Sequence, residues 1–139
     1  MFDKREGEQA LDFDPATKAA DARVVFIGRI ASPWTSRADC PKNMRAARET
    51  GQPAALTVEA PYRVGLAGLE RVSHVAILTW LHEAPRNLIV QKPRHATEAK
   101  GVFALRSPVR PNPVGLHVVR LTGLDVEAGR LALEAIDVL

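Results

Sequence analysis

Short apolar runs separated by glycine and proline fill the chain from residue 23 onwards. Runs of this kind, rich in Val, Ile and Leu, predict β-strands. The expected strands are 23–30, 54–59, 74–81, 88–91, 101–106, 116–124 and 130–138, and a short helix or turn is expected at 62–70. The strand 74–81 is expected to be buried, and the apolar residues of 116–124 predict burial on both faces of that strand. Together these elements indicate a mainly β protein, a small closed or nearly closed β-barrel with short helices and loops.

The same pattern argues against a doubly wound nucleotide-binding sheet. The chain shows neither a β-α-β alternation nor a Gly-x-Gly-x-x-Gly segment, which are typical of such sheets. Residues 1–21 mix charged side chains with Gly, Pro and Ala and show little periodicity. We therefore expect a flexible N-terminal arm at 1–21 and one β-barrel domain at 22–139, a length that suffices to bury a core.

The segment 101–115 reads Gly-Val-Phe-Ala-Leu-Arg-Ser-Pro-Val-Arg-Pro-Asn-Pro-Val-Gly, with prolines at positions 108, 111 and 113. Each proline fixes its own φ and drives the preceding residue towards an extended conformation. The pattern predicts a stiff, non-helical loop that displays Arg106, Ser107, Arg110 and Asn112. Such a loop loses little entropy on binding, and arginine suits carboxylate or phosphate. The alternative is a proline-rich turn with solvated arginines.

Charge and composition limit the classes of partner. The formal net charge is +3, which permits contact with nucleic acid without requiring it. Basic side chains concentrate between residues 86 and 110, where only Glu98 opposes them. Such a run is usually a solvated face, but beside the proline-rich loop it favours a phosphate-facing patch. The candidate RNA contacts are Arg86, Lys92, Arg94 and Arg110.

Membrane, disulfide and metal chemistry are not expected. The longest apolar run, 75–81, is too short to span a bilayer, and the first twenty residues hold no hydrophobic segment. These features predict a cytoplasmic protein without a membrane partner. The single cysteine, Cys40, excludes an internal disulfide and a cysteine-rich zinc site. His95 and His117 are scattered, so we expect no metal.

Three segments resemble the TsaA-like (YaeB-like) family, whose characterised TrmO members are S-adenosylmethionine-dependent tRNA methyltransferases. The segment 101–115 is similar to the family signature, with Leu105 in place of a small hydroxyl residue and Val114 as a mild apolar exchange. The segments 26–34 and 66–75 resemble the family's opening strand and its central segment, so the similarity covers about 24–139. The resemblance implies a compact β-barrel, a homodimer, S-adenosylmethionine as cofactor and the tRNA anticodon loop as partner.

The resemblance also implies which residues bind the cofactor. They are Pro41, Lys42, Asn43, His82, Glu83, Arg106, Leu116, Asp137, Val138 and Leu139. Arg106 would bind the cofactor's carboxylate. Lys42 stands where the family has Arg, which replaces a planar fork by a point charge. The residues themselves leave alternatives open: Asn43 as a loop-capping amide, Leu116 as core, and Asp137 as the end of a strand.

The resemblance implies methyl transfer to N6 of threonylcarbamoyladenosine 37 in tRNA. That nitrogen is a weak nucleophile, so a base or a water relay is expected, with Asp137 and His82 as candidates. The family continues with Asp-Gly-Thr-Pro where this sequence stops at Leu139, so this chain is expected to be shortened or to lack part of the pocket. The alternative functions are a non-catalytic S-adenosylmethionine- or RNA-binding β-barrel and a methyltransferase for small molecules.

Overall fold

The computed structural model describes residues 3–18 and 21–139, which form two units. The first unit comprises the chain up to Arg23 together with Leu78–Gly115, and the second comprises Val24–Ile77 with Leu116–Leu139. No helix in the described ranges is long and apolar enough to cross a membrane.

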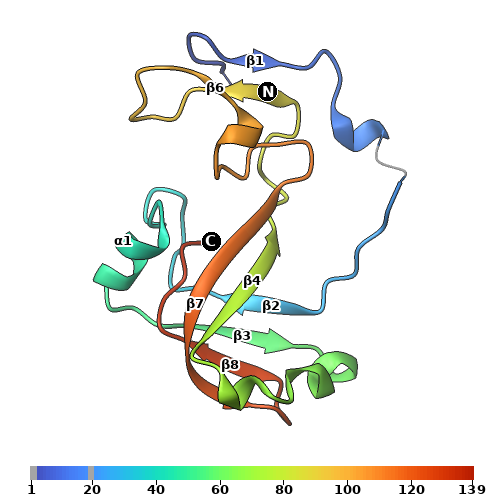
Figure 1. Ribbon diagram of the computed structural model, residues 1–139, viewed down its shortest axis with the longest axis vertical. Helices are drawn as coiled ribbons and strands as arrows, with labels where there is room; N and C mark the ends of the chain where they lie inside the picture. Colours follow the sequence, from blue (N-terminus) through green and yellow to red (C-terminus); the bar gives the residue numbers. More distant parts are fainter. Residues whose placement is uncertain (1–2, 19–20) are drawn as a thin grey trace. The chain divides into compact units, whose positions relative to one another are not determined.

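The main sheet has five strands in the order β2-β3-β8-β7-β4 (Figure 1). Their bounds are β2 Gly28–Ala31, β3 Ala54–Val58, β8 Arg130–Leu133, β7 Val114–Asp125 and β4 His74–Trp80. The strand pairs β2–β3, β3–β8 and β7–β8 are antiparallel. The prediction of a mainly β protein is therefore confirmed.

The sheet does not close into a barrel, so that part of the prediction is wrong. Strands β2 and β4 lie at opposite edges of the sheet order. Closure would need a long β2, but only Gly28–Ala31 is a strand within the expected 23–30. The four apolar residues before it, 24–27, retain exposed fractions of 50–70%. They supply no strand for an edge-to-edge closure.

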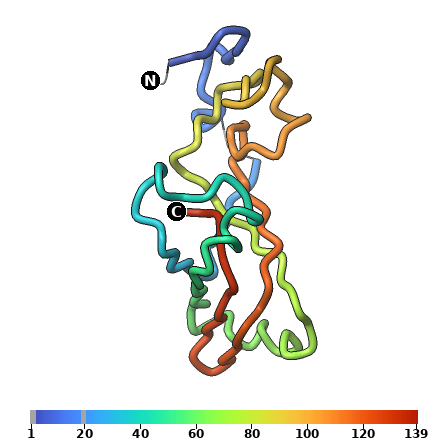
Figure 2. Tube along the Cα trace, turned by 90° about the vertical axis from the view of Figure 1, so that its left-hand side faces the viewer, coloured from blue at the N-terminus to red at the C-terminus, as the bar shows by residue number. Residues whose placement is uncertain are grey.

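A tight hairpin joins β7 to β8, at the orange-to-red end of the chain (Figure 2). The carboxylate of Asp125 accepts a hydrogen bond from the amide of Ala128 at 3.0 Å. Gly129 has φ 69°, in the left-handed region, and a Cβ there would collide with the carbonyl oxygen of Val58. Glycine meets both requirements of this turn.

Burial along β7 alternates instead of covering both faces. Gly115, His117 and Val119 are buried, whereas Leu116 and Val118 are 53% and 52% exposed. The two-residue period of a strand explains this pattern, because only one face of β7 meets the core. The prediction of burial on both faces is wrong for 116–124. The expectation of a buried strand at 74–81 is also wrong, because Ile77 is the only buried residue of β4.

The first unit carries a small antiparallel sheet in the order β1-β5-β6. Its strands are β1 Gln9–Ala10, β5 Leu88–Gln91 and β6 Lys100–Gly101, and the 3₁₀ turn η1 covers Pro15–Lys18. Part of the expected arm therefore has regular structure, since β1 pairs with β5 and the amide of Leu11 donates to the carbonyl oxygen of Asn87 at 2.7 Å. The flexibility of 1–21 stays a prediction.

The helices are short. The turn expected at 62–70 is present as the 3₁₀ helices η2 Ala60–Leu66 and η3 Leu69–Arg71. The strand expected at 101–106 is wrong, because β6 ends at Gly101 and the 3₁₀ helix η4 Val102–Ala104 follows. The helix α1 Met44–Glu49 was not expected from the sequence. The last strand, expected at 130–138, ends at Leu133.

Candidate functional site

The loop 101–115 is held from within by Arg110. The Nη2 atom of Arg110 donates to the carbonyl oxygens of Leu105 at 2.6 Å and Val102 at 3.1 Å, and its Nε donates to that of Ser107 at 3.1 Å. The side chain is half-buried. One planar guanidinium thus ties together three carbonyl groups, and one of the three residues, Ser107, is also restricted because it precedes Pro108. Arg110 stabilises the loop, and its role as an RNA contact stays a prediction.

Arg106 differs from Arg110. Its side chain is exposed, and it forms no hydrogen bond or ion pair with any residue in the described part of the chain. It follows directly after Leu105, whose carbonyl oxygen Arg110 holds. A guanidinium on a fixed backbone, with its N–H groups available, can bind a carboxylate in two parallel hydrogen bonds.

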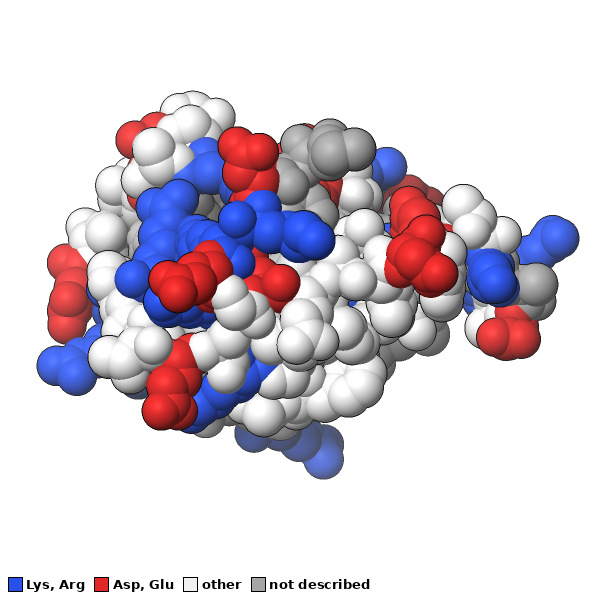
Figure 3. Space-filling model, turned by 90° about the horizontal axis from the view of Figure 1, so that it is seen from above, with Lys and Arg blue, Asp and Glu red and all other residues white. Residues whose placement is uncertain are grey.

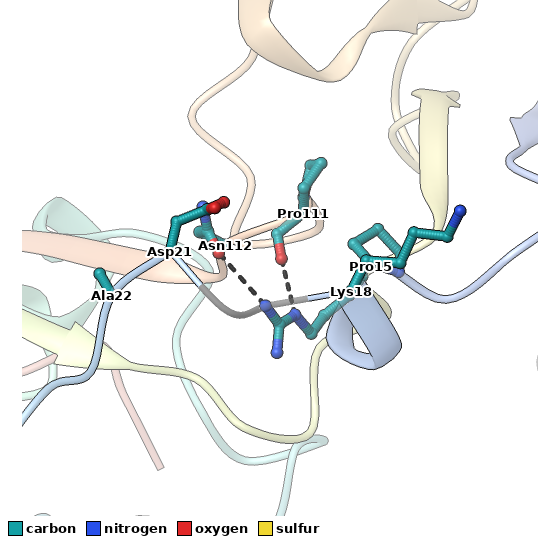
Figure 4. A pocket seen from close by; sticks show the side chains of 7 residues that line it. Pro15, Lys18, Asp21, Ala22, Pro111 and Asn112 are labelled. Atoms are coloured by element: carbon teal, nitrogen blue, oxygen red, sulfur yellow. Dashed lines mark hydrogen bonds between the residues drawn. The ribbon is translucent and has the colours of Figure 1, made fainter.

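Arg86 is bound to the same loop. Its Nε donates to the carbonyl oxygen of Pro111 at 2.6 Å, and its Nη2 donates to Asn112 Oδ1 at 3.2 Å. The guanidinium also lies over the ring of Trp80, 5.3 Å from the centroid, a favourable cation–π contact. Figure 4 shows both hydrogen bonds beside a pocket of about 240 Å³ whose walls include Pro15 and Lys18. This arrangement fixes Arg86, leaving its expected contact with RNA a prediction.

The remaining basic and polar candidates of the first unit lie near the surface. His82 and Glu83 follow β4 directly, and both side chains are exposed, 4.0 Å apart at their nearest nitrogen and oxygen. Arg94 is exposed and Lys92 is half-buried. On the face seen in Figure 3, Lys and Arg side chains gather together but are interrupted by Asp and Glu. The surface charge there is mixed, in keeping with the modest net charge.

In the second unit, Asn43 caps a helix. Its Oδ1 accepts a hydrogen bond from the amide of Ala46 at 2.8 Å, which makes it the N-cap of α1. Asparagine is a preferred residue there because its side chain satisfies an otherwise unpaired helical N–H. The capping alternative for Asn43 is therefore present in the structure. The cap fixes the backbone just after Pro41 and Lys42, of which Lys42 is exposed.

The carboxyl-terminal segment is anchored to the core of the same unit. The indole Nε1 of Trp34 donates to the carbonyl oxygen of Ile136 at 2.7 Å, and both residues are buried. The next residue is Asp137, whose Oδ1 lies 2.6 Å from Nδ1 of His117. An ionised carboxylate only accepts hydrogen bonds, so Nδ1 of His117 is the donor. The side chains of His117 and Asp137 are 8% and 17% exposed.

The charge of Asp137 also reaches Cys40. Burial, and then the nearby Asp137 carboxylate, raise the pKa of the Cys40 thiol above its ordinary value. Cys40 directly precedes Pro41, so two of the predicted cofactor segments, 41–43 and 137–139, are neighbours in this unit. Leu139 is 54% exposed, whereas Val138 is buried. The core alternative for Leu116 does not hold, since that side chain is 53% exposed.

The structure thus divides the predicted cofactor residues between its two units. Arg106, His82 and Glu83 belong to the first, and 41–43, Leu116 and 137–139 belong to the second. Their roles as cofactor contacts remain predictions. Sequence reasoning missed the partner of Asp137, namely His117, and missed the anchoring of Ile136 by Trp34. The alternation of β7, which turns His117 inward beside Gly115 and Val119, was the available signal.

Comparison with known proteins identifies the family to which the chain belongs. Residues 29–139 match the family model of the tRNA-methyltransferase O N-terminal domain. The chain therefore belongs to this TsaA-like, or TrmO, family. It is 37% identical to a TrmO from Pseudomonas aeruginosa of known crystal structure, with a TM-score of 0.65 over 87% of this chain and 51% of the other. A second TrmO crystal structure gives 35% identity and a TM-score of 0.68, over 86% and 52% of the two chains.

Two curated relatives have names that concern binding. A protein of Rhizobium radiobacter named "probable S-adenosyl-L-methionine-binding protein VirR" is 43% identical over 73% of this chain and 56% of its own length. A "probable S-adenosyl-L-methionine-binding protein" of Methanothermobacter thermautotrophicus is 36% identical over 84% of this chain and 83% of its own. The chain thus spans about half of the TrmO structures and most of the archaeal relative.

Proposed function

We propose that this protein is an S-adenosylmethionine-dependent methyltransferase that acts on N6 of threonylcarbamoyladenosine 37 in tRNA. Membership of the TrmO family and the names of the relatives support S-adenosylmethionine as the cofactor. The observation that carries the proposal is the exposed Arg106, held on a stiff loop without a partner among the described residues.

The polar groups present suit this cofactor. S-adenosylmethionine carries a carboxylate, an ammonium group, ribose hydroxyls and an adenine ring, and it supplies a methyl group bonded to a positively charged sulfur. Arg106 offers paired N–H donors for the carboxylate. Asp137, which retains 17% exposure of its side chain, offers an acceptor for hydroxyl or ammonium groups. Leu116, 53% exposed, offers apolar surface.

The protein's task in such a transfer is alignment. When bound, S-adenosylmethionine would supply its methyl group to the nitrogen in an in-line displacement, with S-adenosylhomocysteine as the leaving group. Holding donor and acceptor in that geometry lowers the barrier by several kcal/mol. The nitrogen also loses a proton, which a carboxylate, an imidazole or water can accept. Asp137 and His82 are the residues we propose for that step.

The partners we propose are a tRNA anticodon loop and a second copy of the chain. Single-stranded loops allow a base to leave its stack and enter a site. Arg86, Lys92, Arg94 and Arg110 are the proposed phosphate contacts. The exposed apolar side chains of Leu116 and Val118 on one face of β7 support a homodimer.

A methyl-transfer assay tests the proposal. The purified protein is incubated with S-adenosylmethionine labelled at the methyl group and with tRNA that does or does not carry threonylcarbamoyladenosine. We expect label only in the threonylcarbamoylated tRNA, and digestion of the tRNA to place it on that nucleoside. RNA binding should weaken steeply as salt increases, because bound basic side chains release counterions. Labelling of both tRNAs, or of neither, would contradict the proposed substrate.

A non-catalytic binding protein is the alternative function. The archaeal relative, of which this chain spans 83%, is named a binding protein and not a methyltransferase. A chain that binds S-adenosylmethionine but labels no tRNA would favour this alternative. A chain that labels a small acceptor, with binding that does not depend on salt, would favour a methyltransferase for small molecules.

A further inference from the structure

The buried His117 is hydrogen-bonded to the carboxylate of Asp137, which we propose as a contact of the cofactor. The distance from His117 Nδ1 to Asp137 Oδ1 is 2.6 Å, and the histidine side chain is 8% exposed. Hydrogen bonds between a charged acceptor and a buried donor are among the stronger ones in proteins. The pair therefore restricts the rotation of the Asp137 carboxyl group.

The backbone that carries Asp137 is fixed as well. The carbonyl oxygen of Ile136 accepts the Trp34 indole hydrogen bond at 2.7 Å, and the Ile136 side chain is fully buried. His117 in turn lies on the inner face of β7, next to the fully buried Val119. Both ends of the Asp137 side chain are thus set, its backbone by Trp34 and its carboxyl group by His117.

One carboxylate oxygen is left for a ligand. Only Oδ1 of Asp137 takes part in the hydrogen bond to His117, and within the described ranges Oδ2 accepts no other. The Asp137 side chain is more exposed than that of His117, 17% against 8%. The histidine is bound to Oδ1, and Oδ2 is the oxygen that can accept from a hydroxyl or ammonium group.

We propose that His117 is a positioning residue, which orients the Asp137 carboxylate towards the hydrogen-bond donors of S-adenosylmethionine. This inference rests on the proposed function, since it assumes that Asp137 contacts the cofactor. A purely structural role for the pair would stabilise the fold without affecting binding beyond the loss of folded protein.

Two substitutions separate positioning from stability. His117→Leu removes the donor, whereas His117→Asn retains an amide N–H close to the place of Nδ1. Val119→Ala serves as a matched control, because it creates a cavity on the same face of β7 and leaves the pair intact. Calorimetry with S-adenosylmethionine and with S-adenosylhomocysteine measures binding directly, apart from turnover. Each variant is titrated at a temperature where its unfolding curve shows it folded.

We expect His117→Leu to weaken binding of both ligands about tenfold, the loss of one charge-assisted hydrogen bond. His117→Asn should recover most of that loss, and Val119→Ala should bind like the wild type. In an Asp137→Asn background, His117→Leu should cause little further loss, because the histidine acts through the carboxylate.

Three results would count against this role for His117. Wild-type affinity in folded His117→Leu overturns the inference but leaves the proposed function intact. Fully additive losses in the double variant overturn it too, because His117 would then act independently of Asp137. If the wild-type protein binds neither ligand, the inference and the proposed function both fail.

Discussion

Arg110 Nη2 donates to the carbonyl oxygen of Leu105 at 2.6 Å. Leu105 directly precedes Arg106, so Arg110 fixes the backbone next to the second arginine of the proline-rich loop. The two arginines are four positions apart and have opposite environments. Arg110 is half-buried and is bound to three carbonyl groups, whereas Arg106 is exposed. This division gives the loop a structural arginine and a candidate binding arginine.

Arg110→Lys should weaken binding of S-adenosylmethionine about tenfold while Arg106 remains in place. An ammonium group is too compact to reach three carbonyl oxygens at once, so the loop becomes more mobile and binding has to restore its order. Calorimetry checks the affinity, with Arg94→Lys as an exposed control of equal charge. Equal affinity in wild type and Arg110→Lys would show that the hydrogen bonds of Arg110 do not support the binding loop.

Gly129→Ala should destabilise the protein by about 2 kcal/mol or more. The residue has φ 69°, and a Cβ would meet the carbonyl oxygen of Val58; left-handed backbone alone costs an alanine about 1–2 kcal/mol. Gly65→Ala is the control, because nothing lies within 4 Å of its added Cβ. Urea unfolding measures both free energies. Similar stability in the two variants would contradict the strained turn.

Trp34→Phe should lower the free energy of unfolding by about 1–3 kcal/mol. The change leaves the buried carbonyl oxygen of Ile136 without its donor, and an unpaired buried acceptor costs that much. Trp80→Phe keeps an aromatic ring under the guanidinium of Arg86 and should cost less. Thermal unfolding measures the loss of stability in both variants. A larger loss in Trp80→Phe than in Trp34→Phe would contradict this prediction.

The ionised carboxylate of Glu8 should keep its hydrogen bonds to the amides of Arg5 and Lys92 until the pH falls below the ordinary pKa of glutamate. Burial alone would raise the pKa of Glu8, but hydrogen bonds from the amides of Arg5 and Lys92, with the charge of Arg5, lower it below 4.5. Both bonds are 2.9 Å long. Because folding lowers the pKa of Glu8, the carboxylate stabilises the fold at pH values above its pKa in the unfolded protein. This stabilisation is lost as the pH falls through its pKa in the folded protein.

Amide NMR shifts provide the measurement for Glu8. The amide protons of Arg5 and Lys92 should titrate together, with one midpoint below 4.5, and Glu8→Gln should abolish both titrations. Separate midpoints, or a common midpoint above that value, would show that the carboxylate does not bridge the two amides.

The fold was predictable where a local pattern determines it. The runs at 54–58, 74–80 and 88–91 became β3, β4 and β5 with almost the expected bounds, because β-branched and apolar residues between turn signals specify a strand. Closure of the sheet was not predictable. It depends on which edges meet, and four residues of β2 were too few. The strand at 101–106 failed because the backbone turns into η4 beside a loop tied by Arg110.

The candidate site was predictable in its residue types but not in its partners. The prolines and arginines of 101–115 indicated a stiff, non-helical loop. The structure shows a loop whose carbonyl groups are bound by Arg110, with the 3₁₀ helix η4 at its start. The stiffness of the loop stays a prediction. Nothing in the spacing distinguished Arg106 from Arg110, since only the folded loop brings three carbonyl groups to the second. The pairing of His117 with Asp137 joins residues twenty positions apart, and long-range pairs of this kind depend on strand register.

A calorimetric titration with S-adenosylmethionine on wild type, Arg106→Ala and Arg71→Ala tests whether Arg106 binds the cofactor. Arg71 is an exposed arginine outside the loop and controls for the loss of a positive charge. We predict binding at one site in the wild type, unchanged binding in Arg71→Ala, and affinity at least about tenfold weaker in a fully folded Arg106→Ala. Wild-type affinity in Arg106→Ala would show that the proline-rich loop does not bind the cofactor.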